Sequence, residues 1–409
     1  MAGTLKTNAV QLGDSVTATQ NFVWQTNVDG TAKLARGNVG ATTQDILTVD
    51  AAGNVNIPLI SSLTGVSTLT GAAAGMAVTN VSSINGGPLA GLRNRIINGA
   101  FDVWQRGTSF TGTSPYYGPD RWQCYRQTGS AGATFSQASN NNTTGSYYIK
   151  MSRDSGNALV TALTISTSFE TIENYKLYGK TVTLSFTAVK GANFSATGLT
   201  AQVVYGLGLD GNIAAGLVSQ AVAFGVTVPA ASISSSALGT VFQVTGTVPT
   251  SASQLGVVFI WTPTGTAGAA DWVGVGQVQL EVGSVATPFE QRPYGMELAL
   301  CQRYLQSFVS PDTFGSICSG YAQTATTMIC TYPFVVTPRV PPSGITIGAA
   351  TLYSFTSTAT TVASAVAFNS ASLTSGVLTV TTAGQTAGQG GRLFANAAGE
   401  KLLWTGCEL

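Results

Sequence analysis

The chain has 409 residues, of which 9% are charged and 44% hydrophobic, and its formal net charge is +1. This length exceeds one ordinary core and indicates two to four domains, while the small net charge gives no sign of a nucleic-acid or acidic-membrane surface. The abundance of Gly, Ser, Thr, Ala and Val favours strands and turns over helices. A surface with so little charge stays soluble more readily when partner subunits cover much of it.

The N-terminal residues 1–60 contain two strand-like runs, at 21–25 and 45–50, bracketed by turns that contain glycine. A piece this short, with few large apolar groups, is marginal as an independent core. We expect either a small β domain or an attachment segment that folds against a partner or against copies of itself.

Residues 61–92 form an uncharged segment that is rich in Gly, Ala, Ser and Thr. This composition is typical of a flexible linker. However, Leu63, Val66 and Leu69 recur every three residues, a spacing that suits three chains wrapped around one axis. The segment is therefore either a linker or a trimeric stalk.

Residues 93–292 carry short strands at regular intervals, separated by Gly-rich and Thr-rich turns. About 200 residues of this pattern indicate an antiparallel β-sandwich, and we expect a jelly roll. Pairing of the first and last strands would then bring the opening stretch, 94–107, beside the end of the domain. The predicted strands are 147–151, 158–165, 181–188, 201–205, 241–248, 255–261 and 272–282.

The stretch from Val278 to Phe308 connects this domain to the next one. It starts as an alternating strand, turns at Gly283, and then shows apolar residues at helical spacing. Glu297 lies in the expected first turn and Pro311 follows the expected end, so we predict a connecting helix within 293–310.

Residues 311–409 are predicted to form a second, smaller β-sandwich at the C-terminal end. Within it, 385–391 has no apolar anchor and is expected to be a surface loop. The predicted strands are 320–322, 327–333, 346–347, 352–357, 363–368, 376–382 and 402–405.

The five cysteines show no CxxC or CxxH spacing, which argues against a zinc site. Their odd number and wide spacing are typical of free, buried thiols made in a reducing cytosol. We find no signal-peptide pattern. The most apolar stretch, 217–248, is interrupted by Gly, Pro and Ser and is not expected to span a membrane.

Catalytic chemistry has little support in the sequence. The chain has no histidine, which excludes Ser-His-Asp, Cys-His and His-metal arrangements. A carboxylate pair could still hydrolyse a glycan, but the acidic residues are scattered and no pair forms a motif. We therefore expect no enzymatic activity.

Aromatic residues are the best candidates for binding, because exposed rings stack on the apolar faces of sugars. Tyr116 and Tyr117 lie in a Gly/Ser/Pro loop, and Tyr353 and Phe355 alternate in a predicted strand of the C-terminal domain. These four residues are the predicted receptor contacts. The four tryptophans of the central domain, Trp104, Trp122, Trp261 and Trp272, are expected in the core.

Three stretches resemble bacteriophage tail fibre and tail appendage proteins: Asn94-Arg-Ile-Ile-Asn-Gly with Trp104-Gln-Arg-Gly, Asp120-Arg-Trp, and the run from Val278 to Tyr304. The start of the chain, 10–14 with 34–38 and 45–50, is also similar to the N-terminal ends of such fibres. This resemblance implies a homotrimeric virion component made in the host cytoplasm. Its N-terminus would dock to the tail or baseplate, and its C-terminal end would face a bacterial surface glycan or outer-membrane protein.

The central sandwich of that family is similar to carbohydrate-binding modules, and in such modules a calcium ion often joins the first strand to the last. Asp102 and Glu281 are the candidate ligands. The alternative is that these carboxylates pair with Arg121 or Arg292.

Three functional hypotheses remain at this point: a trimeric tail fibre that attaches to the bacterial surface, a structural appendage or adaptor without specific recognition, and a polysaccharide depolymerase. The first is favoured, and the C-terminal residues 311–409 are expected to make the receptor contact.

Overall fold

The computed structural model describes residues 9–12, 22–26, 31–38, 41–49, 51–52, 55–56, 91–111, 116–126, 132–139, 147–212, 221–235, 240–347, 352–356 and 360–409. The chain divides into two compact units, Met1–Thr79 and Asn80–Leu409, and each is described by itself.

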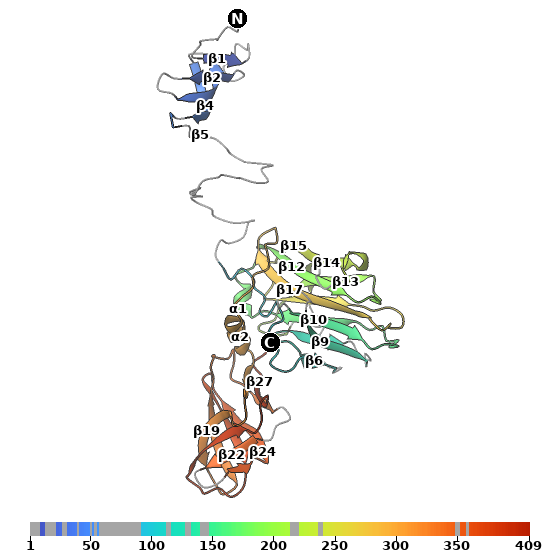
Figure 1. The fold of residues 1–409 in the computed structure, drawn as a ribbon, viewed down its shortest axis with the longest axis vertical. Coiled ribbons are helices and arrows are strands. Elements are labelled where there is room, and N and C mark those ends of the chain that lie inside the picture. The colour runs from blue at the N-terminus through green and yellow to red at the C-terminus, as the bar shows by residue number, and fades with distance from the viewer. Residues whose placement is uncertain are drawn as a thin grey trace. The chain divides into compact units, whose positions relative to one another are not determined.

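The first unit contains an antiparallel sheet whose strands follow one another in chain order (Figure 1). Strand β2 lies one residue beyond the predicted run at 21–25, β4 overlaps the run predicted at 45–50 but begins at Ala41, and β1, β3 and β5 were not predicted. The predicted stalk or linker at 61–92 lies outside the described residues, apart from its last two positions. The strands are β1 (Ala9–Leu12), β2 (Phe22–Thr26), β3 (Ala32–Asn38), β4 (Ala41–Val49) and β5 (Val55–Asn56).

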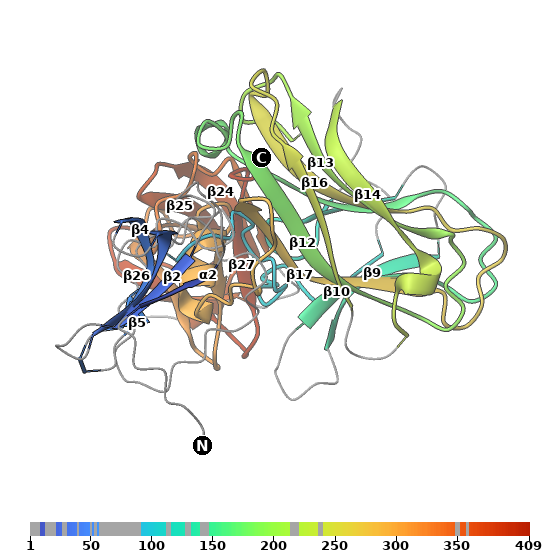
Figure 2. The ribbon, with the colours of Figure 1, turned by 90° about the horizontal axis from the view of Figure 1, so that it is seen from above.

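The second unit begins with two facing antiparallel sheets, ordered β15-β12-β17-β10-β9-β6 and β14-β13-β16-β11-β8-β7 (Figure 2). Strand β10 pairs with β17, and β11 with β16, so strands early in the fold lie beside strands late in it. This nested pairing is that of a jelly roll, and the predicted architecture is confirmed. The strands are β6 (Ser109–Phe110), β7 (Tyr116–Tyr117), β8 (Gln123–Arg126), β9 (Ala133–Ser139), β10 (Tyr147–Arg153), β11 (Leu163–Ser168), β12 (Thr181–Lys190), β13 (Gly198–Gly206), β14 (Ala221–Pro229), β15 (Thr240–Thr247), β16 (Gln254–Trp261) and β17 (Trp272–Val282), with the short helices α1 (Thr171–Asn174) and η2 (Ala230–Ser232).

The jelly-roll core follows from the period of two in its strands, which places alternate side chains between the sheets. Phe186 of β12 and Phe259 of β16 meet across this layer with ring centroids 4.9 Å apart. Trp122 and Trp261 are fully buried and Trp104 is 9% exposed, as predicted for core residues. Trp272 differs: it is half-buried and stacks on Tyr148 at 6.4 Å.

The opening stretch of the domain lies against its last strand, as predicted. Arg95 N donates to Leu280 O (2.8 Å) and Val278 N donates to Gly99 O (2.9 Å). A side chain at Gly99 would overlap Val278 O, so glycine is needed for this approach. The buried Asn94 amide reinforces the contact, because its Nδ2 donates to Val278 O and its Oδ1 accepts from Leu280 N.

Helix α2 (Tyr294–Gln302) connects the jelly roll to the C-terminal domain. The helix is shorter than the range predicted at 293–310, because β18 (Gln306–Val309) pairs with β27 instead of continuing the helix. The Gln306 side chain donates to Gln302 O, 2.8 Å away, and to Val336 O. Apolar spacing therefore extended the predicted helix across a turn and into a strand.

The C-terminal domain is a second β-sandwich, as predicted, with sheets ordered β23-β22-β26-β19-β20-β25-β24 and β18-β27-β21. Its core surrounds Trp404, whose ring lies 5.3 Å from Phe334 and 5.8 Å from Tyr332. The strands are β19 (Ser316–Ala322), β20 (Thr327–Pro333), β21 (Gly344–Ile347), β22 (Leu352–Thr356), β23 (Thr360–Val362), β24 (Ala365–Ala371), β25 (Ser375–Thr381), β26 (Gly390–Ala395) and β27 (Lys401–Thr405).

The predicted surface loop at 385–391 is wrong in part. Gln385 is 5% exposed, and its Nε2 donates to Thr361 Oγ1 (2.9 Å) and to Ala383 O (3.1 Å). Gly390 begins β26, which pairs with both β19 and β22 inside the sheet. Amide hydrogen bonds and backbone pairing hold this segment, and neither produces an apolar pattern in the sequence.

Candidate functional site

The jelly roll and the C-terminal domain meet through the buried side chain of Gln105. Its backbone N and its Nε2 donate to the two carboxylate oxygens of Asp120 (2.7 and 2.8 Å). Its Nε2 also donates to Leu305 O (3.2 Å), and its Oε1 accepts from the Ser307 hydroxyl. These contacts fix the amide at the boundary between the two domains.

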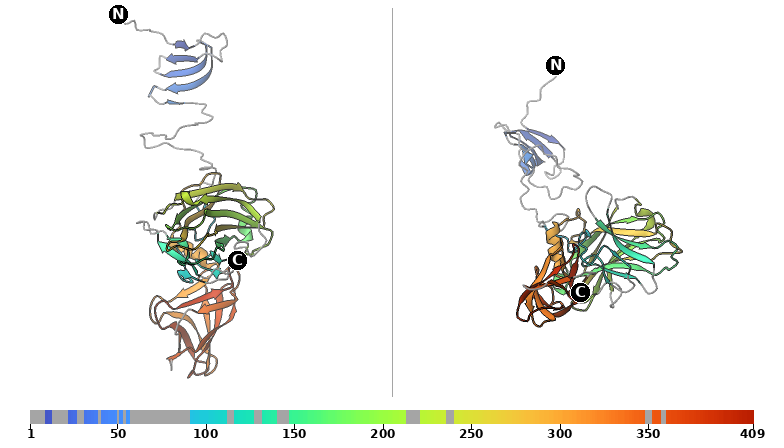
Figure 3. Two further views of the ribbon diagram at one scale, coloured as in Figure 1. Left: turned by 90° about the vertical axis from the view of Figure 1, so that its right-hand side faces the viewer. Right: turned by 60° about the horizontal axis from the view of Figure 1, so that its bottom comes forward.

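Glu408 adds charge pairing to the same boundary. Its carboxylate lies 2.6 Å from Arg106 and 3.4 Å from Arg121, two residues of the jelly roll. The Arg121 guanidinium also lies 3.6 Å from the centre of the Tyr304 ring. The chain end marked C in Figure 3 lies beside the jelly roll, where the Tyr117 hydroxyl donates to Leu409 O.

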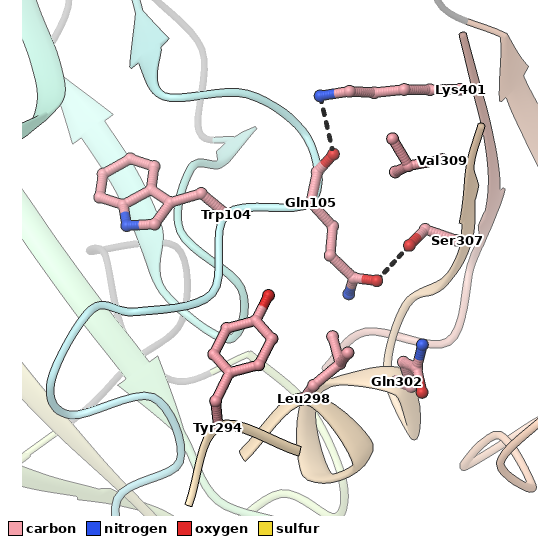
Figure 4. A pocket seen from close by; sticks show the side chains of 8 residues that line it. All are labelled: Trp104, Gln105, Tyr294, Leu298, Gln302, Ser307, Val309 and Lys401. Atoms are coloured by element: carbon pink, nitrogen blue, oxygen red, sulfur yellow. Dashed lines mark hydrogen bonds between the residues drawn. The ribbon is translucent and has the colours of Figure 1, made fainter. Parts of the chain in front are cut away.

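A pocket of about 430 Å³ opens at this boundary (Figure 4). Tyr294 of α2 points its ring between Trp104 and Gln105, and Lys401 reaches across from β27 toward the backbone of Gln105. The Lys401 Nζ lies 3.4 Å from Gln105 O. The lining residues are Trp104, Gln105, Tyr294, Leu298, Gln302, Ser307, Val309 and Lys401.

A second pocket, of about 560 Å³, shares Trp104 and Tyr294 with the first and therefore adjoins it. We call the two together the boundary groove. Asp102 and Lys401 lie in the separate parts of this groove, and the aromatic pair is common to both. The second pocket is lined by Asp102, Trp104, Gln137, Tyr147, Gln291 and Tyr294.

The aromatic residues of the boundary groove differ in their contacts and in their exposure. Trp104 is held in place, because its Nε1 donates to Phe101 O (2.6 Å) and its ring stacks on Phe110 at 6.2 Å. Tyr294 is 59% exposed and Tyr147 is 38% exposed. A fixed indole edge and two open phenol rings, accompanied by glutamine amides, are suited to a ligand with both apolar faces and hydroxyl groups.

Asp102 is the acidic residue of the groove. Burial raises the pKa of its carboxyl to about 6, and the negative charge of Glu297 acts in the same direction. Its Oδ2 accepts from Gln291 Nε2 at 3.4 Å. Burial also raises the pKa of Tyr294, with Asp120 nearby as a further cause.

The two predicted calcium ligands, Glu281 and Asp102, lie in different surroundings. Glu281 is 1% exposed, and its carboxylate accepts from Thr287 N (2.7 Å), Thr287 Oγ1 (2.8 Å) and Gln279 Nε2 (2.8 Å). Asp102 lines the groove. Within the described ranges, no three His, Cys, Asp or Glu side chains gather as a metal site. The calcium hypothesis gains no further support.

The predicted receptor contacts Tyr116 and Tyr117 form β7 at the edge of one jelly-roll sheet. Tyr116 lies 5.6 Å from Phe110 and 6.3 Å from Phe135, measured between ring centroids. Tyr117 carries Arg106 on its ring at 5.2 Å. Both side chains are half-buried and contact other side chains of the jelly roll, and receptor contact by these two residues stays a prediction.

Tyr353 and Phe355 lie on β22, and their side chains fall outside the described part of the chain. Sequence reasoning missed Tyr147 and Tyr294 as candidate contacts, and it assigned Trp104 only to the core. One feature of the sequence could have pointed to them: Trp104 and Tyr294 lie in the two motifs, 94–107 and 278–304, that the fold brings together.

Three of the scattered carboxylates, Asp271, Glu170 and Glu290, have structural partners. Asp271 lies 2.6 Å from Arg153 inside the jelly roll. Both oxygens of Glu170 accept from Arg303 at 2.9 Å, and Glu290 accepts from Leu92 N and Asn94 N. Each is therefore committed to holding a loop or strand. In the part of the chain that is described, no helix is long and apolar enough to cross a membrane.

The fold and the groove define a β-sandwich protein with an open, aromatic and amide-lined site at a domain boundary. No protein-family model matches the chain, and no curated protein matches it.

Solved structures with some similarity include the enzymatically active domain of tailspike protein 4 from bacteriophage CBA120, which is 15% identical over 46% of this chain and 21% of that chain, with a TM-score of 0.28. The C-terminal family 22 carbohydrate-binding module of Clostridium thermocellum Xyn10B is 13% identical over 41% of this chain and 89% of that chain, with a TM-score of 0.25. The K1 adhesin domain of Lys-gingipain from Porphyromonas gingivalis is 15% identical over 44% of this chain and all of that chain, with a TM-score of 0.27. Similarities at this level carry no functional inference.

Proposed function

We propose that this chain is a bacteriophage tail fibre subunit that attaches the virion to a glycan on the bacterial surface, and that it acts as a non-enzymatic binding protein. The observation that carries the attachment function is the boundary groove, where Trp104, Tyr147 and Tyr294 meet several glutamine amides. Pyranose rings present apolar faces to such rings and hydroxyls to such amides. The virion assignment rests on the sequence motifs, two of which pack together in the fold.

The N-terminal unit would dock to the phage tail or baseplate, and the fibre would be a homotrimer located in the virion. The sequence has no Asp, Glu, Lys or Arg between Asp210 and Asp271, and the edge strands β14 and β15 both lie in this stretch. Val222 and Val241 on these strands are 52% and 65% exposed. Edge strands of monomeric proteins usually carry charges that block association, so uncharged edges support contact between copies.

A glycan array of bacterial polysaccharide fragments tests the attachment function. Tyr294→Ala should lose about tenfold in affinity, because it removes an exposed stacking ring. Tyr175→Ala is the matched control, since Tyr175 is 62% exposed and does not line the groove. Binding that Tyr294→Ala leaves unchanged would remove the groove from the proposal. A wild-type protein that binds no glycan and no cells would favour the purely structural appendage.

Light scattering of the full chain tests the homotrimer. We expect three copies at micromolar concentration, and we expect Val241→Lys to weaken their association. Val335→Lys is the control, because Val335 is 79% exposed and lies in the C-terminal domain. A stable single copy of the wild-type chain would contradict the fibre assignment, and release of new reducing ends from host polysaccharide would favour a depolymerase.

A further inference from the structure

The pocket in Figure 4 has one charged lining residue, Lys401. Its side chain is half-buried, and its Nζ contacts Gln105 O at 3.4 Å, which is close to the limit for a hydrogen bond. Among the described residues, no carboxylate forms a salt bridge with Lys401. A half-buried ammonium that lacks a counter-charge is available to an anion from outside.

The acidic residues near this pocket are already engaged. Asp120 is 1% exposed, donors of Gln105 occupy both of its oxygens, and Arg106 lies 3.9 Å away. Glu408 is held between Arg106 and Arg121. Since these carboxylates have cationic neighbours of their own, they do not neutralise Lys401.

The second pocket of the boundary groove carries a negative charge in place of a positive one. Its charged lining residue is Asp102, and the aromatic pair Trp104 and Tyr294 stands between Asp102 and Lys401. A bound saccharide would therefore meet a cation at one end, rings in the middle and a carboxylate at the other end. This polarity favours one direction for an acidic ligand.

We propose that the Lys401 end of the boundary groove binds the anionic substituent of an acidic saccharide, a carboxylate or a phosphate, while Trp104 and Tyr294 hold the sugar ring next to it. The Lys401 ammonium supplies charge-assisted hydrogen bonds to the anion. Ser307 and Gln302 lie on the same wall and provide polar groups for neighbouring hydroxyls. This inference rests on the proposed function, because it names the ligand class of the same groove.

The test compares acidic glycans with their neutral counterparts on one array, using the full-length protein. Uronate-bearing and phosphate-bearing fragments are printed beside the same fragments after carboxyl reduction or dephosphorylation, so that the two sources of negative charge are separated. We expect the wild type to prefer the acidic members. Lys401→Gln should lose about tenfold to a hundredfold in affinity for them and should keep its affinity for neutral members.

Two further variants make the result specific. Lys401→Arg keeps the charge and should retain the acidic preference, and Lys176→Gln is the control, because Lys176 is 55% exposed and already paired with Glu173. Equal binding of acidic and neutral glycans by the wild type, with loss only in Tyr294→Ala, would overturn this inference and leave the proposed function standing. Absence of any glycan binding would overturn both.

Discussion

Replacing Glu408 with alanine should separate the C-terminal domain from the jelly roll. The change removes the carboxylate that pairs with Arg106 at 2.6 Å and with Arg121 at 3.4 Å. Arg121 is 3% exposed, so its guanidinium would stay buried without its ion pair, in contact with Ser168 O and the Tyr304 ring and within electrostatic reach of Glu170. Breaking a buried ion pair typically costs about 3–5 kcal/mol. Because Glu408 and Arg106 are 11% and 15% exposed, water offsets part of this, and we expect a loss of about 2–3 kcal/mol.

Urea unfolding and calorimetry measure this effect. The wild-type jelly roll and C-terminal domain should unfold in one transition, and Glu408→Ala should split it, since their coupling depends on this contact. Glu173→Ala is the control: its partner Lys176 is 55% exposed, and such surface pairs contribute about 0.5 kcal/mol or less. If the two variants lose the same small amount of stability, the charge contact does not couple the domains and the reasoning is wrong.

Three other predictions follow from features of the same unit. Burial is the main cause that raises the pKa values of Asp102 and Asp120 to about 6, whereas the pKa of an aspartate in an unfolded chain is about 3.9. Between these two values the folded protein binds more protons than the unfolded chain, so its stability should fall as the pH rises from about 4 to about 6. Asp102→Asn should flatten this slope in urea titrations, and an unchanged slope would contradict the assignment. Gly99→Ala should lower the free energy of unfolding by about 2 kcal/mol or more, because its Cβ would overlap Val278 O. Gly295→Ala is the control: there is open space around Gly295 in α2, so this change should be neutral or stabilising in the same unfolding assay. Equal effects of the two changes would argue against the close approach of Gly99 to Val278. All five cysteines are buried and form no disulfide, and burial raises the pKa of Cys407 to about 11. A thiol reagent should therefore label none of them until the protein unfolds. Rapid labelling of the native protein would contradict this burial.

The strand pattern was the feature of the sequence that predicted the structure most reliably. The strand predicted at 272–282 has the bounds of β17, and the strand predicted at 327–333 has the bounds of β20. In β20, burial alternates along the strand and imposes a period of two on the residue types, whereas β17 is buried on both faces. The jelly roll followed from the number and spacing of such runs, and its nested pairing confirmed it.

The sequence did not predict the elements whose positions depend on backbone and side-chain hydrogen bonds. Strand β26 carries two glycines and an arginine among its six residues, and pairing on both sides gives it a central position that its composition does not indicate. Helix α2 was overextended because Leu305 and Phe308 continue its apolar spacing although the backbone has already turned into β18. Local pattern cannot distinguish these cases, since the deciding hydrogen bonds come from residues distant in the sequence.

The candidate site was the least predictable part of the molecule. Tyr116 and Tyr117 were chosen because a Gly/Ser/Pro loop suggested exposure, yet both are half-buried in β7, where their rings contact Phe110, Phe135 and Arg106. Trp104 and Tyr294 are nearly 200 positions apart in sequence, and only the docking of α2 against the opening stretch brings them together. A groove formed between two domains has no contiguous signature in either of them.

The clasp formed by Glu408 and Leu409 sets an order for biosynthesis. All strands of the jelly roll have been synthesised once Val282 has left the ribosome, but Arg106, Tyr117 and Arg121 must wait for more than a hundred further residues before their partners arrive. During that interval Arg106 and Arg121 lack the Glu408 carboxylate, and the pocket of Figure 4 lacks the side formed by Ser307, Val309 and Lys401.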